Sequence, residues 1–494
     1  MTLRNLGAAV TSADPSATAL IDLGGSAPRS FSYADIQRLS DACARGLLHR
    51  GLQRGERVAI LAANSAEYLI AFLGTMRAGL VSAPVNYKLP AETVNFIIED
   101  ADVRFVLCDT TRSELLRSDV PHVVIDKAFR SLLDEGEWAA VETEPAEPAM
   151  FLYTSGSTGR PKGVVLSHQS HLWVLKMRAT PTPPPGQRIL VAAPLYHMNA
   201  LSVCQVALNT GSTIVLLPSF TATCFIDAAS RYRVHALTGV PTMIAMILRE
   251  REAIAAADFS SVKALRIGSA PLSEQLIEQI RQAMPGVRIL HGYGTTEAGP
   301  VAFGAPSGEL EPPPLSVGAP HPAVDVRLVR DGLEVADEGV LEMRCPALMN
   351  GYHKLPDVTR KVMTSDGYYI TGDVFRRDTH GFHYFVGRAD DMFVCGGENI
   401  YPGEVEEMLE RHPSVHQACV VPIPDELKAY KPVAFIVPRP GAVIREHDIK
   451  QFALVNAPAY QHPRRVWFLD ELPLASTNKI DRRRLAQQAM TEVG

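Results

Sequence analysis

The sequence predicts an α/β protein with a large N-terminal domain of βαβ-type sheets and helices, followed by a small α+β domain. Its 494 residues allow two or three domains, and a hydrophobic content of 46% supports large buried cores. Short apolar runs alternate with amphipathic stretches through most of the chain. This alternation is typical of βαβ units and indicates a mainly parallel sheet.

The first elements follow from caps and apolar runs. Ser32 is expected to cap a helix over residues 33–50, and Gly51 to end it. Beyond this helix, strands and helices should alternate. The predicted strands are 57–61, 81–85 and 104–107, and the predicted helices are 65–78 and 91–100.

The middle and the end of the chain continue the pattern. We expect a strand at 164–167, a helix at 198–208, strands at 214–217, 237–241, 265–267 and 287–290, and a helix after Thr242. The last hundred or so residues predict an α+β domain of ordinary size. Its elements are a helix at 402–411, strands at 415–421 and 433–437, a helix at 446–455 and a strand at 465–468.

Charge and composition narrow the class of protein. A net charge of −6 argues against a nucleic-acid partner, which needs a basic surface. The seven cysteines form no C-x-x-C pair, which favours reduced thiols in the cytoplasm. The N-terminus does not resemble a signal peptide, and no apolar run approaches the length of a membrane span. We therefore expect a soluble cytoplasmic protein.

A glycine-rich stretch at residues 153–164, Tyr-Thr-Ser-Gly-Ser-Thr-Gly-Arg-Pro-Lys-Gly-Val, predicts a phosphate-binding loop. Its glycines let the backbone approach a ligand closely. Successive N–H groups can surround an anion, and Ser, Thr and Lys side chains add donors. The stretch does not have Walker A spacing, because Lys162 is followed by Gly163.

A second motif, Gly-Tyr-Gly-Thr-Thr-Glu at residues 292–297, closes a turn after a predicted strand. Tyr293 offers a face on which a flat ring can stack, and Thr296 can donate to a phosphate oxygen. Glu297 is a hard oxygen ligand suited to Mg²⁺, which binds through few carboxylates plus substrate phosphates.

Residues 153–164 resemble the signature of the adenylate-forming superfamily, which includes acyl-CoA synthetases, peptide-synthetase adenylation domains and beetle luciferases. Residues 292–297, the Tyr-Ile-Thr-Gly-Asp stretch at 369–373 and the Gly-Arg-Ala-Asp-Asp stretch at 387–391 agree, and the resemblance covers nearly the whole chain. It implies that a carboxylic acid, ATP and Mg²⁺ give acyl-AMP, and that coenzyme A then takes the acyl group.

The resemblance assigns nucleotide-binding residues by position. The residues expected to bind ATP or AMP are Thr154, Ser155, Gly156, Ser157, Thr158, Gly159, Lys162, Gly268, Ala270, Pro271, Gly292, Tyr293, Gly294, Thr295, Asp373 and Arg388. Asp373 corresponds to the aspartate that accepts from the ribose hydroxyls.

Catalysis and domain movement are also assigned by resemblance. Lys479 matches the lysine of the adenylation step, although Asn478 stands where glycine is usual; asparagine also tolerates the left-handed conformation. The expected catalytic residues are Lys479, His197, Thr296 and Glu297. Asp390 matches the hinge between an N-terminal domain, 1–390, and a mobile lid, 391–494. Gly396, Gly397 and Glu398 are expected to line the path of coenzyme A.

The acyl pocket is expected beside His197. Its predicted wall consists of Asn199, Ala200, Val203, Val240, Met243, Gly299, Pro300 and Val301. This lining has no cation, so we expect a neutral-tailed acid of medium length or with one aromatic ring.

The resemblance leaves other partners of the acyl group open. An adenylating ligase that loads a carrier protein is the alternative to a CoA ligase. Amino-acid activation is disfavoured because Met198 stands where an acidic residue would hold the ammonium group, and residues 194–217 contain no Asp or Glu. A non-catalytic nucleotide-binding relative is disfavoured because the reactive residues are all present. A monomer or homodimer is expected.

Overall fold

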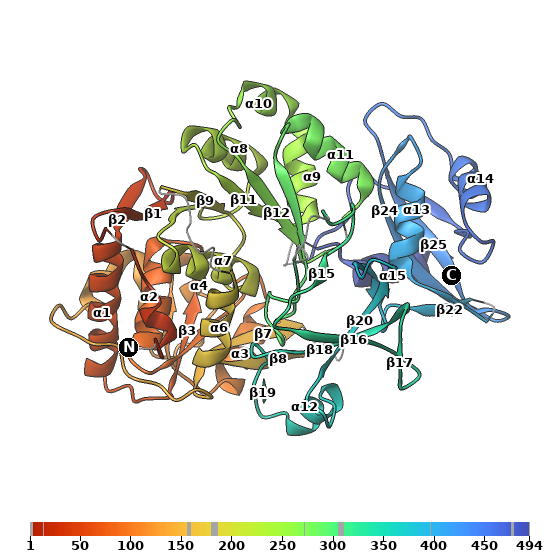
Figure 1. Ribbon diagram of the computed structural model, residues 1–494. Coiled ribbons are helices and arrows are strands. Elements are labelled where there is room, and N and C mark those ends of the chain that lie inside the picture. The colour runs from red at the N-terminus through yellow and green to blue at the C-terminus, as the bar shows by residue number, and fades with distance from the viewer. Residues whose placement is uncertain are drawn as a thin grey trace.

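The fold is described here from a computed structural model, which describes residues 3–12, 14–155, 160–178, 186–270, 272–304, 311–395, 397–475 and 479–493. Figure 1 shows a large lobe made of the N-terminal and middle parts of the chain and a smaller lobe, drawn in blue, made of its C-terminal part. The mixed α/β architecture predicted from the sequence is confirmed.

One sheet of seven strands is parallel except at one edge. Its order is β13 (Arg288–Gly292), β12 (Ala264–Gly268), β11 (Ala236–Gly239), β9 (Arg188–Val191), β10 (Thr213–Leu216), β1 (Thr18–Asp22) and β2 (Arg29–Ser32). The edge strand β2 runs antiparallel to β1. The register of β12 and β13 pairs Gly268 with Gly292.

A second sheet of seven strands contains the predicted phosphate loop. Its order is β19 (Gly351–Tyr352), β8 (Pro161–Ser167), β7 (Pro148–Ser155), β4 (Val81–Pro84), β3 (Arg57–Leu61), β5 (Val103–Cys108) and β6 (His122–Val124). Strands β7 and β8 form an antiparallel hairpin, and β19 pairs with the outer side of β8.

Helices cover both sheets (Figure 1). Ser32 caps α1 (Tyr33–His49) through a capping box with Asp35, as the sequence predicts. The N-terminal helices are the short η1 (Leu6–Ala8), α2 (Ala66–Arg77), α3 (Ala91–Asp100), α4 (Thr110–Ser113) and α5 (Ile125–Leu132). The middle helices are α6 (His168–Arg178), α7 (Met198–Asn209), α8 (Ala222–Arg231), α9 (Pro241–Arg249), α10 (Arg251–Ala256) and α11 (Glu274–Ala283).

A third, antiparallel sheet joins the large lobe to the small one. Its order is β17 (Leu333–Val335), β16 (Asp325–Arg330), β18 (Glu338–Arg344), β20 (Tyr369–Arg377) and β21 (His383–Arg388). The pair β14 (Phe303–Gly304) and β15 (Ala319–Pro320) and the helix α12 (Pro356–Val362) lie near it in the chain.

The small lobe has its own sheet and apolar cores. Its elements are β22 (Phe393–Cys395), β23 (Glu398–Ile400), α13 (Pro402–Glu410), β24 (Val415–Asp425), β25 (Ala429–Pro438), α14 (Glu446–Asn456), β26 (Val466–Phe468) and α15 (Arg482–Val493). Phe393, Val405 and Ile436 pack in one core, and Phe435 and Leu485 in another. The boundary at residue 390 stays a prediction. No helix within the described ranges is long and apolar enough to cross a membrane.

Candidate active site

The β7–β8 hairpin fixes both ends of the predicted phosphate loop. Thr154 and Lys162 face each other in register, and Ser155 pairs with Pro161. Gly163 has no room for a side chain, because a Cβ would lie 2.9 Å from the Tyr153 ring. The other predicted loop residues, Gly156, Ser157, Thr158 and Gly159, lie outside the described residues, as do Pro271 and Gly396.

Tyr352 connects two charged groups of the site. Its hydroxyl donates to Glu297 Oε1 at 2.9 Å, and the Lys162 ammonium lies 4.7 Å from the centre of its ring. Burial, reinforced by the Glu297 charge, raises the pKa of the Tyr352 hydroxyl, which therefore stays a neutral donor. A lysine and a carboxylate are thus held beside the end of the β7–β8 hairpin.

Close backbone packing shapes the Gly292–Glu297 turn. A Cβ on Gly268 would lie 2.6 Å from the Gly292 carbonyl oxygen, and one on Gly294 would lie 2.6 Å from Pro300 Cα. Thr295 Oγ1 accepts from the Ala298 N–H at 2.9 Å. Glycine is therefore required where the backbones meet, and the turn presents Thr296 and Glu297 in a fixed conformation.

Asp373 lies at the centre of a polar cluster. It accepts from the Tyr293 hydroxyl at 2.5 Å and from Arg388 Nη1 at 2.9 Å. Burial raises the pKa of Asp373, although Arg388 and Tyr293 oppose the shift. The ring of Tyr293 packs edge-on against Phe375, with 4.8 Å between ring centres. The structure therefore brings together three residues that the sequence assigns to the nucleotide.

His197 caps the start of α7 at the end of a turn held by Asn64. The Asn64 amide donates to the carbonyls of Ala193 and Leu217 and accepts from the Leu195 N–H. The buried Nε2 of His197 has no hydrogen-bond partner within the described residues. Burial, and then the charges of Lys479 and Lys88, lower the pKa of His197 to about 4. The imidazole is therefore neutral at physiological pH.

Lys479 of the small lobe faces the same region. The Leu474–Ile480 bridge flanks it, and its carbonyl accepts a 2.7 Å hydrogen bond from the Ala475 N–H. Burial lowers the pKa of Lys479. The negative charge of Asp373 opposes this shift, and the positive charge of Arg388 adds to it. The charge of Lys479 also lowers the pKa of His197. The Lys479 ammonium therefore lies within electrostatic range of His197, Asp373 and Arg388.

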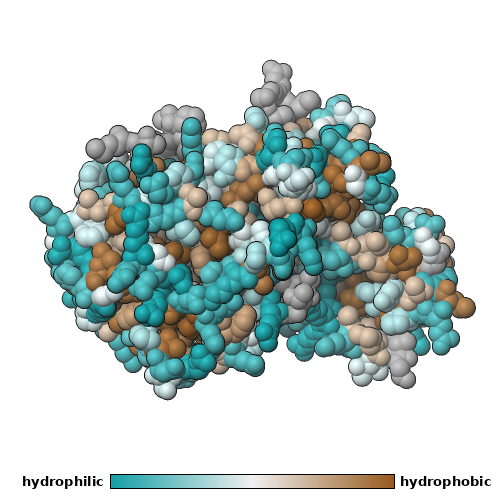
Figure 2. All heavy atoms as spheres, turned by 90° about the horizontal axis from the view of Figure 1, so that it is seen from below, coloured by the Kyte–Doolittle hydropathy of each residue, from teal (hydrophilic) through white to brown (hydrophobic). Residues whose placement is uncertain are grey.

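Several site residues keep solvent-accessible surface. His197 and Tyr293 are partly buried, and Lys479 is exposed. Figure 2, which views the molecule from below, shows the small lobe meeting the large one along a hollow.

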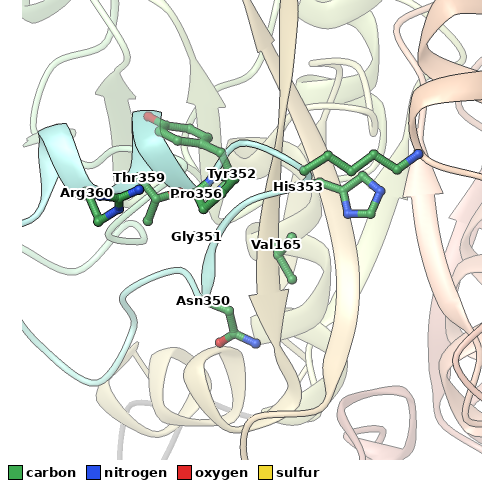
Figure 3. Close-up of a pocket in the computed structure, with 9 residues that line it drawn as sticks. Val165, Asn350, Gly351, Tyr352, His353, Pro356, Thr359 and Arg360 are labelled. Atoms are coloured by element: carbon green, nitrogen blue, oxygen red, sulfur yellow. Dashed lines mark hydrogen bonds between the residues drawn. The ribbon is translucent and has the colours of Figure 1, made fainter.

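A surface pocket adjoins the site at Tyr352 (Figure 3). Residues of β8, β19 and the start of α12 line it, among them Val165, Gly351 and Thr359. Tyr352 and its neighbour His353 point in different directions from β19. The Tyr352 side chain therefore links this pocket to Glu297.

The protein side chains of the site suit Mg²⁺ only if a nucleotide supplies further oxygen ligands. The described residues contain no group of three His, Cys, Asp or Glu side chains that could hold a metal. Glu297 offers a half-buried carboxylate, and Mg²⁺ ordinarily uses one or two carboxylates plus substrate phosphates and water. Glu297 therefore fits a metal that arrives with a nucleotide.

The predicted acyl-pocket residues divide between two cores. Ala200, Val203 and Val301 pack in the large core that contains α6 and α7. Val240 and Met243 pack with α8, α9 and α11 in a separate core. Asn199 is partly exposed on α7, and Gly299 approaches α6, since its Cβ position would lie 3.4 Å from Val174.

The hinge and coenzyme A residues lie on the small-lobe side of the third sheet. Arg388 Nε donates to Asp390 Oδ1 at 2.9 Å, so the predicted hinge residue is bound to the nucleotide cluster. Gly397 has a φ of +91°, a conformation that favours glycine, and Glu398 is exposed on β23.

Sequence reasoning missed four residues of this region. Tyr352 and Asn64 form hydrogen bonds with site groups, Arg178 donates to Ser202 on α7, and Arg266 lies beside Gly292. The expectation of a lining without cations stays a prediction, because Arg178 and Arg266 come from segments that sequence reasoning did not connect with the pocket. Of these four residues, only Tyr352 carried a signal in the sequence, because it is an aromatic residue that follows a glycine, Gly351.

Comparisons with known proteins agree with this geometry. Residues 8–353 match the AMP-binding enzyme family, and residues 404–479 match the AMP-binding enzyme C-terminal domain. The chain therefore belongs to the family of AMP-binding enzymes. It is an acid–thiol ligase of the AMP-forming acyl-CoA synthetase type, and the predicted resemblance to adenylate-forming enzymes is confirmed.

Similar proteins cover nearly the whole chain. It is 32% identical over 484 residues to a feruloyl-CoA synthase of Amycolatopsis sp, with 94% of each chain covered. It is 30% identical to the fatty acid–[acyl-carrier-protein] ligase ScoC of Streptomyces coeruleorubidus, with 92% and 91% covered. ATP-bound MatB from Rhodopseudomonas palustris has the same fold, with a TM-score of 0.90, 27% identity and full coverage of both chains.

Proposed function

We propose that this enzyme activates a carboxylic acid of medium length, or with a single aromatic ring, and transfers the acyl group to coenzyme A. The products are acyl-CoA, AMP and pyrophosphate. The observation that best supports this proposal is the position of Lys479, which reaches from the small lobe toward His197, Asp373 and Arg388. The similarity to a feruloyl-CoA synthase supports an aromatic acid.

In the first step, a carboxylate oxygen attacks the α-phosphorus of ATP. The bond from this phosphorus to the β-phosphate oxygen breaks, and pyrophosphate leaves. Two anions must approach each other, so positive charge and fixed geometry lower the barrier most. Lys162 and Lys479 supply positive charge, and Mg²⁺ held by Glu297 would neutralise further phosphate charge.

The polar cluster would hold the nucleotide while this occurs. Asp373 accepts from the ribose hydroxyls, and Arg388 keeps the carboxylate oriented. The Tyr293 ring is fixed at its outer end by its bond to Asp373, which leaves one face for adenine. Neutral His197 places an imidazole next to the acid without adding a charge that must be neutralised.

In the second step, the thiolate of coenzyme A attacks the acyl carbon and AMP leaves with the bonding electrons. In this proposal Lys479 would block the approach of a thiol to the acid during the first step. We propose that rotation at Asp390 withdraws Lys479 and brings Gly397 and Glu398 to the cleft. A glycine at 397 leaves room for the narrow arm of coenzyme A.

A carrier-protein thiol is the second candidate acceptor, because the similarity to ScoC supports it. The chemistry of acyl-AMP formation is identical for both acceptors. The two functions differ only in which thiol accelerates acyl transfer.

One assay tests the proposal. Pyrophosphate release would be measured with benzoate, cinnamate, hexanoate, octanoate and acetate, with no thiol, with coenzyme A or with a phosphopantetheinylated carrier protein. We expect release with a ring or medium-chain acid, and turnover that is faster with coenzyme A. Turnover stimulated only by the carrier protein would replace the CoA assignment, and no release with any acid would contradict the function itself.

A further inference from the structure

Two arginines lie close together beside the predicted acyl-pocket helix. Arg178 is the last residue of α6, and its Nη1 donates to Ser202 Oγ on α7 at 2.6 Å. Arg266 comes from β12, and its guanidinium lies 3.2 Å from the position that a Cβ on Gly292 would occupy. Two cations therefore border the region between α7 and the Gly292–Glu297 turn.

The side chain of Arg266 points toward the α6–α7 layer. Its neighbours Leu265 and Ile267 pack into the core formed with α9 and α11. Successive strand residues point to opposite faces of a sheet, so Arg266 lies on the other face. Both arginines are only partly buried, so each keeps solvent-accessible surface.

This pair has no counter-ion in the described part of the chain. None of the ion pairs formed there includes Arg178 or Arg266. By contrast, the enclosed Arg482 is bound by both oxygens of Glu406. Burial lowers the pKa of Arg178, and the charge of Arg266 lowers it further. Enclosing two like charges is costly unless an anion joins them.

Arg178 contacts α7 beyond the end that carries His197. Val174, one turn before Arg178, approaches Gly299. Along α7, Ser202 follows His197 by five positions, which corresponds to about 7.5 Å of helix rise. Gln205, one turn further along α7, has a buried amide nitrogen with no partner within the described residues. The far end of this wall therefore offers hydrogen-bond donors that no described acceptor uses.

We propose that Arg178 and Arg266 bind a second anionic group, a carboxylate or sulfonate, at the far end of the acid substrate. This inference rests on the proposed function and specifies its substrate class. The spacing along α7 selects an acid whose two anionic groups are separated by a ring or a medium-length chain. Guanidinium groups suit this role because they form paired, charged hydrogen bonds with carboxylates.

The test compares acids that differ only in the distal charge. Pyrophosphate release would be measured for adipate against hexanoate, suberate against octanoate, and terephthalate against benzoate. We expect wild-type enzyme to prefer the dianionic member of at least one pair. Arg178→Leu and Arg266→Leu should each lower kcat/KM for that diacid about 10- to 100-fold, the range of a lost charged hydrogen bond, with the ATP constant unchanged. Arg178→Lys should retain part of the activity.

Control variants distinguish a loss of anion binding from a loss of folding. They also test whether an acidic residue outside the described ranges neutralises the arginines. Arg231→Leu removes an exposed arginine on α8 and should leave the preference unchanged. The leucine variants should melt no lower than wild type, because they remove unpaired enclosed charges. Glu309 is the one acidic residue outside the described ranges; if it neutralised the arginines, wild type would prefer monoacids and Glu309→Gln would create diacid activity.

Several outcomes would overturn the inference. A wild-type preference for the monoacid in every pair, or equal losses on both members of a pair in the leucine variants, would contradict distal anion binding while leaving acyl-CoA synthesis intact. Absence of release with every acid, monoacids included, would contradict the proposed function and the inference together.

Discussion

At the scale of single residues, Tyr352 organises the groups expected to meet the phosphates. Its hydroxyl orients Glu297, and its ring supports the ammonium of Lys162. A neutral donor to a carboxylate fixes that carboxylate without cancelling its charge. We therefore propose Tyr352 as a positioning residue that would act on the nucleotide through Glu297.

Replacing Tyr352 with phenylalanine should weaken the use of MgATP. We expect the Michaelis constant for MgATP to rise roughly tenfold, since hydrogen bonds to charged groups contribute about 1.5–3 kcal/mol. The constant for the acid should change little. Steady-state kinetics at varied MgATP would measure this. Tyr384→Phe, which removes a comparable 3.0 Å bond to Asp378, is the matched control; equal effects of the two variants would contradict the role.

The proton on Lys479 should set the alkaline limit of adenylation. Burial lowers its pKa, so the ammonium loses its proton, and its charge, at a lower pH than an ordinary lysine. We expect kcat/KM for pyrophosphate formation to fall on the alkaline side below pH 10.5, and Lys479→Arg to move that fall upward. An alkaline limb unmoved by the arginine substitution would show that another group titrates there.

Sequence patterns could locate many of these residues but not their partners. The Gly292–Glu297 turn is visible because glycines follow an apolar strand. The Tyr352–Glu297 bond spans 55 positions, and no local pattern links the two residues. Arg178 and Arg266 were missed for the same reason, since each looks like an ordinary charged residue at the end of a helix or within a strand.

At the scale of elements, local signals predicted the βαβ part well. The helix expected at 33–50 is Tyr33–His49, and the strand expected at 57–61 is Arg57–Leu61. Caps, glycine stops and buried apolar runs are local features. The antiparallel sheet from β16 to β21 was not predicted, because its strands alternate exposed and buried residues and pair across turns that carry weaker signals.

The segment between β21 and β22 is where the lid should turn. Asp390→Pro should keep acyl-AMP formation and lose thioester formation, because proline fixes φ where the rotation must change it. Asp390→Asn removes the ion pair with Arg388 but leaves φ free, so it should retain both steps. Single-turnover assays of each half-reaction would measure this. Full turnover by the proline variant would place the hinge elsewhere.

At the scale of the whole molecule, a few polar contacts hold the lobes in the present arrangement. Arg249 Nε of α9 donates to His416 Nε2 of β24 at 3.3 Å. Glu410 at the end of α13 accepts from the Ala418 N–H at 3.1 Å and is also hydrogen-bonded by Ser273 of the large lobe. Such limited polar contacts suit an interface that must open during each cycle.

Glu410 should make stability depend on pH. Burial raises its pKa from 4.5 to about 8, so the folded state holds a proton that the unfolded state releases. Its contribution is fully present below pH 4.5 and is lost as pH rises through about 8, at up to about 1.4 kcal/mol per pH unit. Melting temperatures of Glu410→Gln should lack this slope, and those of Glu407→Gln should keep it. Identical profiles for wild type and both variants would contradict the assignment.

The most direct test of the account is the pair of half-reactions of Lys479→Ala. We propose that the lysine acts on the acid and nucleotide before the lid rotates, so it should serve the first step alone. We expect acid-dependent pyrophosphate formation to be lost, while thioester formation from supplied acyl-AMP and coenzyme A stays within a few-fold of wild type. Equal losses in both half-reactions would contradict the assignment of Lys479 and the two-step use of the lid.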